Sequence, residues 1–247
     1  MNKNWYYPKK LKEFEKKVRE GVEPANTGGD FGSYKIMLDS GDLEQSMIGC
    51  HNDLDPESKL LMIKAFIKRN MPLLEINSIL NVGCGLGFET KALTNIFNCM
   101  CMGVDASIDG VNYAKKNNLN NKTKYLAATI DSDFLLDSKY DICFAREFYP
   151  FTRTKDIVFQ QSIISSLFNN IKPGSPLILY QLFDQEESIK ENILLIAKNL
   201  NKKVIVSKRI IYRFYQIIPN FFLCNLFSII YEQIFNKKIS NRIIIFY

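Results

Sequence analysis

The stretch SILNVGCGLGFET, residues 78–90, decides the fold that this sequence predicts. An apolar run of strand type leads directly into Gly83, Gly85 and Gly87, and a segment with helical character follows. Glycine weakens both strands and helices, so three glycines at alternate positions need a reason. A strand, a glycine turn and a helix present bare backbone and amide N–H groups to a ligand held over the carboxyl end of a sheet. We therefore expect a ligand site at this turn.

Short apolar runs alternate with longer helical patterns after this turn. Strands are expected at residues 78–83, 100–105, 124–129, 140–145 and 175–181. Helices are expected near residues 88–97, 107–117, 155–170 and 186–200. Repeated units of this kind predict a parallel sheet that is covered by helices on both faces.

Two further strand-like runs, at residues 203–212 and 241–247, break this order because an apolar and aromatic segment, residues 213–239, separates them. The segment is about as long as a bilayer requires, but polar residues interrupt it, so a membrane span is not expected. Three interpretations stay open. The segment is a helical insertion that covers the substrate site, a homodimer surface, or a peripheral contact with a membrane.

The N-terminal region has a different pattern. Residues 8–20 place apolar side chains at helical spacing, whereas residues 21–52 mix glycine, acidic and aromatic residues in a long irregular stretch. Pro56 then marks a helix start. We expect residues 1–75 to form a helical cap and lid, and residues 76–247 to form the main domain.

Composition and charge limit the classes of protein and partner. The 247 residues are 47% hydrophobic and 23% charged, as in ordinary soluble globular proteins. The six cysteines form no CxxC pair, so neither a metal site nor a disulfide framework is expected. The first residues lack the apolar core of a signal peptide, which favours a cytoplasmic location. Residues 151–247 hold 13 Lys and Arg against 6 Asp and Glu, which favours an anionic partner or a solubilising surface.

Four more motifs follow the glycine turn. GVDAS, residues 103–107, places Asp105 22 residues after Gly83, where its carboxylate can accept hydrogen bonds from the two hydroxyls of a ribose. The others are ATID at 128–131, YDICFAREFY at 140–149 and IKPGSPLIL at 171–179. In this order and spacing, together with ILNVGCGLG at 79–87, the set resembles the class I S-adenosylmethionine-dependent methyltransferases, particularly their small-molecule branch.

This resemblance implies a fold, a cofactor and a set of residues that bind the cofactor. The fold is a Rossmann-like α/β fold with a seven-stranded, mostly parallel sheet, helices on both faces, an N-terminal helical cap and a helical insertion before the last strand. The cofactor is S-adenosyl-L-methionine. Its implied binding residues are Asn81, Gly83, Cys84, Gly85, Gly87, Asp105, Ala106, Ile130, Asp131 and Arg146.

The resemblance also implies a role for each residue. The glycine turn with Cys84 approaches the methionine and ribose parts of the cofactor, and the carboxylate at the end of the second strand binds the ribose. Ala106 lines the adenine face, while Ile130 and Asp131 hold the adenine ring and its amino group. Arg146 lies near the sulfonium and the methionine tail.

Two positions depart from the family pattern. Asn81 stands where the first motif usually has an acid that helps to hold the methionine amino group, and Thr129 stands where the third motif usually has one. Asparagine can still accept a hydrogen bond, so the first change weakens binding without excluding it. Because Asp105 and the three glycines are kept, we expect catalysis. The alternative is a non-catalytic scaffold protein with the same fold.

The sequence says least about the methyl acceptor and the residues that act on it. The catalytic candidates are His51, Glu147 and Tyr149, with Tyr34 as a competitor. The near-neutral pKa of an ordinary histidine favours His51 as a base, although a loop histidine without function is the plainer interpretation.

The motifs of DNA methylation are absent. Residues 146–151 read REFYPF, which lacks the motif of amino-methylating DNA enzymes, and the chain contains no Pro-Cys pair. No DNA partner is therefore expected. We expect a small, anionic or phosphorylated acceptor, such as a sugar-nucleotide or cell-surface glycan precursor, with an RNA substrate as the alternative.

Overall fold

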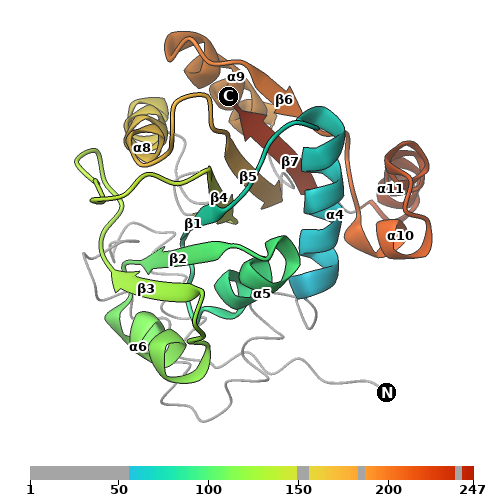
Figure 1. The fold of residues 1–247 in the computed structure, drawn as a ribbon. Coiled ribbons are helices and arrows are strands. Elements are labelled where there is room, and N and C mark those ends of the chain that lie inside the picture. Colours follow the sequence, from blue (N-terminus) through green and yellow to red (C-terminus); the bar gives the residue numbers. More distant parts are fainter. Residues whose placement is uncertain (1–55, 149–155, 183–186, 237–240) are drawn as a thin grey trace, which may run out of the picture.

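The computed structural model of the protein describes residues 56–148, 156–182, 187–236 and 241–247. Figure 1 shows a twisted sheet with helices packed around it. The strands are β1 (Ser78–Val82), β2 (Met100–Asp105), β3 (Thr123–Ala127), β4 (Ile142–Arg146), β5 (Leu177–Leu182), β6 (Val204–Val206) and β7 (Asn241–Phe246). The helices are α4 (Pro56–Asn70), α5 (Phe88–Phe97), α6 (Ile108–Asn117), α8 (Ile157–Asn169), α9 (Glu187–Asn199), α10 (Tyr212–Ile217) and α11 (Phe221–Phe235).

The seven strands form one sheet in the order β3-β2-β1-β4-β5-β7-β6. The first five strands run parallel, and β7 lies antiparallel to both β5 and β6. Strand β1 lies between β2 and β4, so the strand order reverses at β1, where the glycine turn begins. Such a reversal is where open α/β sheets bind ligands, beyond the carboxyl ends of their strands. The predicted Rossmann-like α/β class is confirmed.

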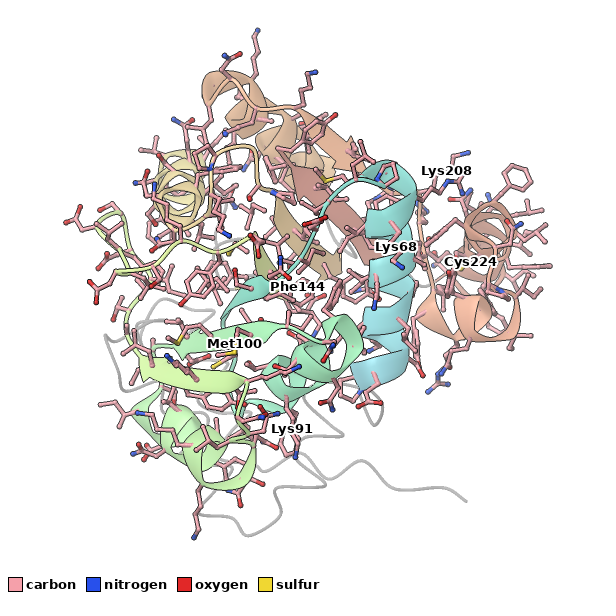
Figure 2. The ribbon with its side chains drawn as sticks, in the orientation of Figure 1. Lys68, Lys91, Met100, Phe144, Lys208 and Cys224 are labelled. Atoms are coloured by element: carbon pink, nitrogen blue, oxygen red, sulfur yellow. The ribbon has the colours of Figure 1, made fainter. Side chains whose placement is uncertain are left out.

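Two hydrophobic layers hold the helices on the sheet. On one face, Leu60, Ile63 and Phe66 of α4 pack with apolar residues of α5 and with Phe144 of β4, which Figure 2 labels near the centre of the molecule. On the other face, α8 and α9 pack against Leu80 and neighbouring strand residues. Apolar side chains cover both faces because a parallel sheet excludes water on both sides.

The alternating part of the chain follows the sequence prediction within a few residues, but the C-terminal part does not. Of the run 203–212, only Val204–Val206 is a strand, and Ile210 then makes an isolated bridge to Asn241. The expected helical insertion forms two helices within its described part, α10 and α11, with Pro219 between them. Proline has no backbone N–H to donate within a helix, so α10 does not continue through Pro219. Asn220 is the N-cap of α11, because its side-chain oxygen accepts the backbone N–H groups of Phe222 and Leu223.

Helix α4 begins at Pro56 as predicted and packs into the same core as the sheet. The expected helix 8–20, the irregular stretch 21–52, Tyr34 and His51 lie outside the described residues. The division of the chain at residue 75 therefore stays a prediction. Within the part that the structure describes, no helix combines the length and the apolar composition that crossing a membrane requires.

Candidate functional site

The glycine turn folds back on the end of β2. Gly83, Gly85 and Gly87 all have positive φ, at 72°, 51° and 82°. The N–H groups of Gly83 and Cys84 donate to the carbonyl of Val104, at 2.8 and 3.1 Å. Positive φ is unfavourable for residues with a side chain, so the backbone path of the turn itself requires glycine.

The space around Gly83 and Gly87 gives a second reason for glycine at these two positions. A Cβ on Gly83 would lie 3.3 Å from the ring of Phe148. A Cβ on Gly87 would lie 2.6 Å from Cβ of Ala114 and 2.8 Å from the ring of Tyr125. Gly87 therefore lets α6 and β3 pack closely against the turn, and its expected approach to the cofactor stays a prediction.

Gly103, in the middle of β2, is a residue that the sequence analysis did not single out. A Cβ there would lie 2.8 Å from both Oγ1 of Thr90 and the ring of Tyr125. Because Gly103 has no Cβ, the side chains of Thr90 and Tyr125 can pack under the turn. A glycine inside an apolar strand run is the signal that could have indicated this close approach.

Asp105 closes the turn from the carboxyl end of β2. Its Oδ2 accepts the N–H of Gly85 at 2.8 Å, and its Oδ1 accepts the N–H of Ser107 at 2.8 Å. Burial raises the pKa of this carboxyl above its ordinary value, and the two backbone hydrogen bonds oppose that shift. Each oxygen keeps a second acceptor position, so the carboxylate can still receive two hydroxyls. Ser107 caps α6 by accepting the N–H of Gly110.

Arg146 forms an ion pair with Glu89 beside this turn. Its Nε lies 2.8 Å from Oε2 of Glu89, and both side chains are largely buried, at 17% and 10% exposed. The pair connects the end of β4 with the first turn of α5. Glu89 was missed because an acid in the first turn of a helix is ordinary and gives no separate signal.

Asn81 lies beneath the turn, fully buried in β1. Its Nδ2 donates to Oγ1 of Thr90 at 2.9 Å, while its Oδ1 has no hydrogen-bond partner among the described residues. A buried acceptor without a partner is costly, so this oxygen is a candidate contact for a donor on a ligand.

The remaining predicted cofactor residues follow the ends of β2 and β3. The side chain of Cys84 packs against Val111 and Tyr125, and burial raises the pKa of its thiol, so this side chain is part of the core. Ala106 is half-buried and follows the end of β2. Ile130 is buried in the core beneath the sheet edge.

Asp131 is exposed, and it closes a turn by accepting the N–H of Asp133 at 3.0 Å. Thr129, two residues earlier, is half-buried. The structure therefore leaves the Asp131 side chain open to solvent at this edge while its Oδ1 already holds the local turn.

The expected acceptor side of the edge lies after β4 and β5. Glu147 has φ 46°, is exposed, and accepts the Nδ2 of Asn241 at 3.0 Å. Gln181 on β5 is buried, and neither atom of its amide group has a hydrogen-bond partner in the described part of the chain. Tyr149 and His51 fall outside the described residues, so their expected roles stay predictions.

These groups fit S-adenosylmethionine. A buried carboxylate can hold the ribose hydroxyls, an ion pair offers one group of each sign to the charged methionine end, and Asn81 keeps a free acceptor beneath the turn. No cluster of three or more metal-ligating side chains occurs in the described ranges. A glycine turn and a buried carboxylate at the carboxyl edge of a parallel sheet are the arrangement typical of nucleotide-binding α/β folds.

Comparisons with known proteins make the class specific. A family model described as a methyltransferase domain matches residues 75–217, more than half of the chain. The chain belongs to this methyltransferase domain family, and the predicted S-adenosylmethionine-dependent methyltransferase class and cofactor are confirmed.

Individual relatives agree with this class. The sterol 24-C-methyltransferase of Candida albicans is 29% identical over 121 residues, which cover 47% of this chain and 31% of that protein. The match thus spans about a third of the length of that curated relative.

Two solved structures share the fold at low identity. The plantazolicin methyltransferase BpumL, in complex with a pentazolic substrate analogue and SAH, has a TM-score of 0.59 at 14% identity, and the match covers 96% of this chain and 98% of that one. The magnesium protoporphyrin IX methyltransferase of Synechocystis PCC 6803, with bound SAM, has a TM-score of 0.52 at 15% identity, with 83% of each chain covered.

Proposed function

We propose that this protein transfers the methyl group of S-adenosylmethionine to a small, anionic or phosphorylated metabolite, such as a sugar-nucleotide or cell-surface glycan precursor. The observation that carries the proposal is the Asp105 carboxylate. It is buried at the end of β2, held by two backbone N–H groups, and directly beside the glycine turn. A buried carboxylate is costly unless it is hydrogen-bonded, and the hydroxyls of a ribose would add hydrogen bonds to those from the backbone.

The ion pair of Arg146 and Glu89 supports a specific way of holding the methionine end. That end carries a carboxylate and an ammonium group, so the guanidinium would bind the carboxylate and Glu89 would bind the ammonium. On this proposal Glu89 supplies the acid that Asn81 lacks. The family pattern had placed that acid on β1, and the structure offers one from α5 instead.

Methyl transfer requires mainly that the acceptor atom is aligned with the methyl group of the cofactor. When bound, the cofactor supplies a methyl group on an activated sulfonium, ready for in-line displacement. The protein then has to orient the acceptor and exclude water. Phe148, which packs against Gly83, provides an apolar wall next to the turn. On this proposal Glu147 orients the acceptor or takes up its proton, and His51 and Tyr149 are the alternative bases.

Two features support a polar, anionic acceptor. The basic excess of the sequence lies in residues 151–247, which include the three strands that lie beyond β4 in the sheet. The amide of Gln181 is buried near the carboxyl end of β5 without a partner in the described residues, so a polar ligand group would satisfy it. The relatives are named for a sterol, plantazolicin and magnesium protoporphyrin IX, so the fold alone does not select the acceptor.

Calorimetric titration and a consumption assay test the proposal together. The full-length protein is titrated with S-adenosylmethionine and S-adenosylhomocysteine, and micromolar binding is expected. Formation of S-adenosylhomocysteine is then followed with metabolite pools divided into anionic and neutral fractions, and with a separate RNA pool. Activity confined to the anionic fraction supports the proposal. Activity with RNA alone would establish the alternative substrate, and absence of cofactor binding would indicate a scaffold protein.

A matched variant separates acceptor recognition from cofactor binding. Gln181→Leu keeps the size of the side chain and removes its polar atoms. The expected result is an unchanged cofactor affinity with a raised KM for the acceptor. An unchanged KM would show that Gln181 does not contact the acceptor.

A further inference from the structure

Helix α11 has its polar side turned inward and its apolar side turned outward. Figure 1 shows α10 and α11 at the edge of the molecule, beyond α4. Phe222, Leu226, Ile230 and Ile234 follow one another at four-residue spacing and are 64%, 44%, 41% and 68% exposed. Residues at this spacing lie on one helix face. We call the exposed apolar side chains of α10 and α11 the outer face, which consists of Ile217, Phe222, Leu226, Phe227, Ile230, Ile234 and Phe235.

The inner side of α11 is fixed by polar contacts. Ser228 is buried, accepts the N–H of Ile211 at 2.8 Å and donates to the carbonyl of Cys224 at 2.7 Å. Glu232 is buried and pairs with Arg209 at 2.8 Å. Cys224, labelled in Figure 2, belongs to the same core as residues of α4. These contacts hold the helix in an orientation opposite to that of an ordinary surface helix, whose apolar side faces the core.

Lys208 and Arg213 supply exposed positive charge beside the outer face, within a basic part of the sequence. Residues 202–242 contain eight Lys and Arg and one acid, Glu232, which the ion pair with Arg209 already neutralises. Lys208, labelled in Figure 2, places its Nζ 5.6 Å from the ring centre of Phe222, at the border of the outer face. Arg213 on α10 is exposed. An apolar helix face bordered by cations is the composition of a helix that lies in the interface of an anionic bilayer.

We propose that the outer face of α10 and α11 docks this methyltransferase on an anionic lipid surface. Helix α11 has 15 residues, so it extends about 22 Å and can lie along the interface. The charge pattern favours lipid over a second copy of the chain. A symmetric pair of outer faces would bring the same cations together, and like charges at such a contact are unfavourable. This inference goes beyond the proposed reaction, because it concerns where the enzyme works.

Vesicle flotation of the full-length protein tests the docking. Vesicles of phosphatidylcholine mixed with phosphatidylserine are compared with vesicles of phosphatidylcholine alone. The wild-type protein is expected to float with the anionic vesicles, and less so at high salt, because salt screens the cations. The double substitution of Ile230→Ser with Ile234→Ser should reduce the bound fraction about tenfold. Val158→Ser, at a position 75% exposed on α8, is the matched control and should bind like wild type.

A second variant keeps the apolar residues and removes the charge. Lys208→Glu with Arg213→Glu should lose binding to anionic vesicles while the oligomeric state stays unchanged. Absence of wild-type flotation with anionic vesicles would overturn the proposal. The proposal would also be overturned if the wild-type protein formed a dimer without binding vesicles, and if the Ile230 and Ile234 substitutions dissociated that dimer. Flotation gained only after removal of residues 1–52 would also overturn it, because the chain's own N-terminal segment would then be the occupant.

Cofactor titration of the same variants keeps this test separate from that of the reaction. The outer face contains none of the residues assigned to the cofactor or the acceptor. Both double variants should therefore bind S-adenosylmethionine as wild type does. Loss of flotation with intact cofactor binding supports docking, and flotation without any cofactor binding would count against the reaction alone.

Discussion

Replacing Asp105 by asparagine tests the site most directly. The carboxylate holds the N–H groups of Gly85 and Ser107 at 2.8 Å each, and its remaining acceptor positions are the ones that a ribose diol would use. Asp105→Asn keeps the shape but has one oxygen where the carboxylate has two. The loss of two charge-assisted hydrogen bonds should weaken cofactor binding by about 2 to 4 kcal/mol, or about 30-fold to 900-fold in Kd.

The fold should tolerate this change. The substitution leaves one buried backbone N–H facing an amide nitrogen, which is unfavourable, but it also removes a buried charge, which is favourable. We expect these effects to oppose each other, so the free energy of unfolding should change by about 1 kcal/mol or less. Calorimetry gives the Kd, and urea unfolding gives the stability. Asp137→Asn, in an exposed loop position, is the control and should change neither quantity.

The raised pKa of Asp105 adds a test by pH. Burial makes the folded protein bind this proton more readily than the unfolded chain. The group therefore adds stability at pH values below its unfolded pKa, and this contribution is lost as pH rises through the folded pKa. Cofactor binding should follow the opposite trend, because the ribose needs the ionised form. Asp105→Asn should abolish both trends. An unchanged Kd in this variant, or an unchanged pH dependence of binding, would refute the assignment.

Three further predictions concern the turn, the opposite edge of the sheet and the N-terminal region. Gly85→Val should abolish cofactor binding measured by calorimetry, because φ is 51° there and a β-branched residue in that conformation costs about 1–3 kcal/mol. Asp141→Asn should destabilise the protein by about 1–3 kcal/mol at neutral pH. Burial opposes ionisation of this carboxyl, but hydrogen bonds from Lys172, Asn77 and Ser78 leave its pKa lowered, so its contribution is lost as pH falls through that pKa and the variant should converge with wild type in acid unfolding curves. Removing residues 1–52 should reduce the rate of methyl transfer far more than it reduces the affinity for the cofactor. Full turnover by the shortened protein would contradict the prediction that the N-terminal region forms a lid over the site.

Local pattern predicted most of the fold. The strands β1 to β5 and the helices α5, α6, α8 and α9 come from hydrophobic periodicity and glycine or proline punctuation, which are written in neighbouring residues. The place of Asp105 beside the glycine turn could be predicted for the same reason, because its distance from Gly83 along the chain is fixed by one helix and one strand. Pro219, one of the residues that interrupt the apolar segment in the sequence, lies where α10 and α11 separate.

Contacts between distant residues decided the rest. Glu89 reaches Arg146 across 57 positions of sequence only because α5 begins where β4 ends, and Gly103 is required by side chains from α5 and β3. The orientation of α11 is the clearest case. Its composition indicated an apolar helix, but which side faces outward depends on Arg209, Ile211 and the buried polar groups that they meet. The sequence alone therefore determined the class of the fold and the place of the Asp105 carboxylate beside the glycine turn. The tertiary structure decided the ion pair and the exposed apolar face, because packing and charge pairing act between residues that only the folded chain brings together.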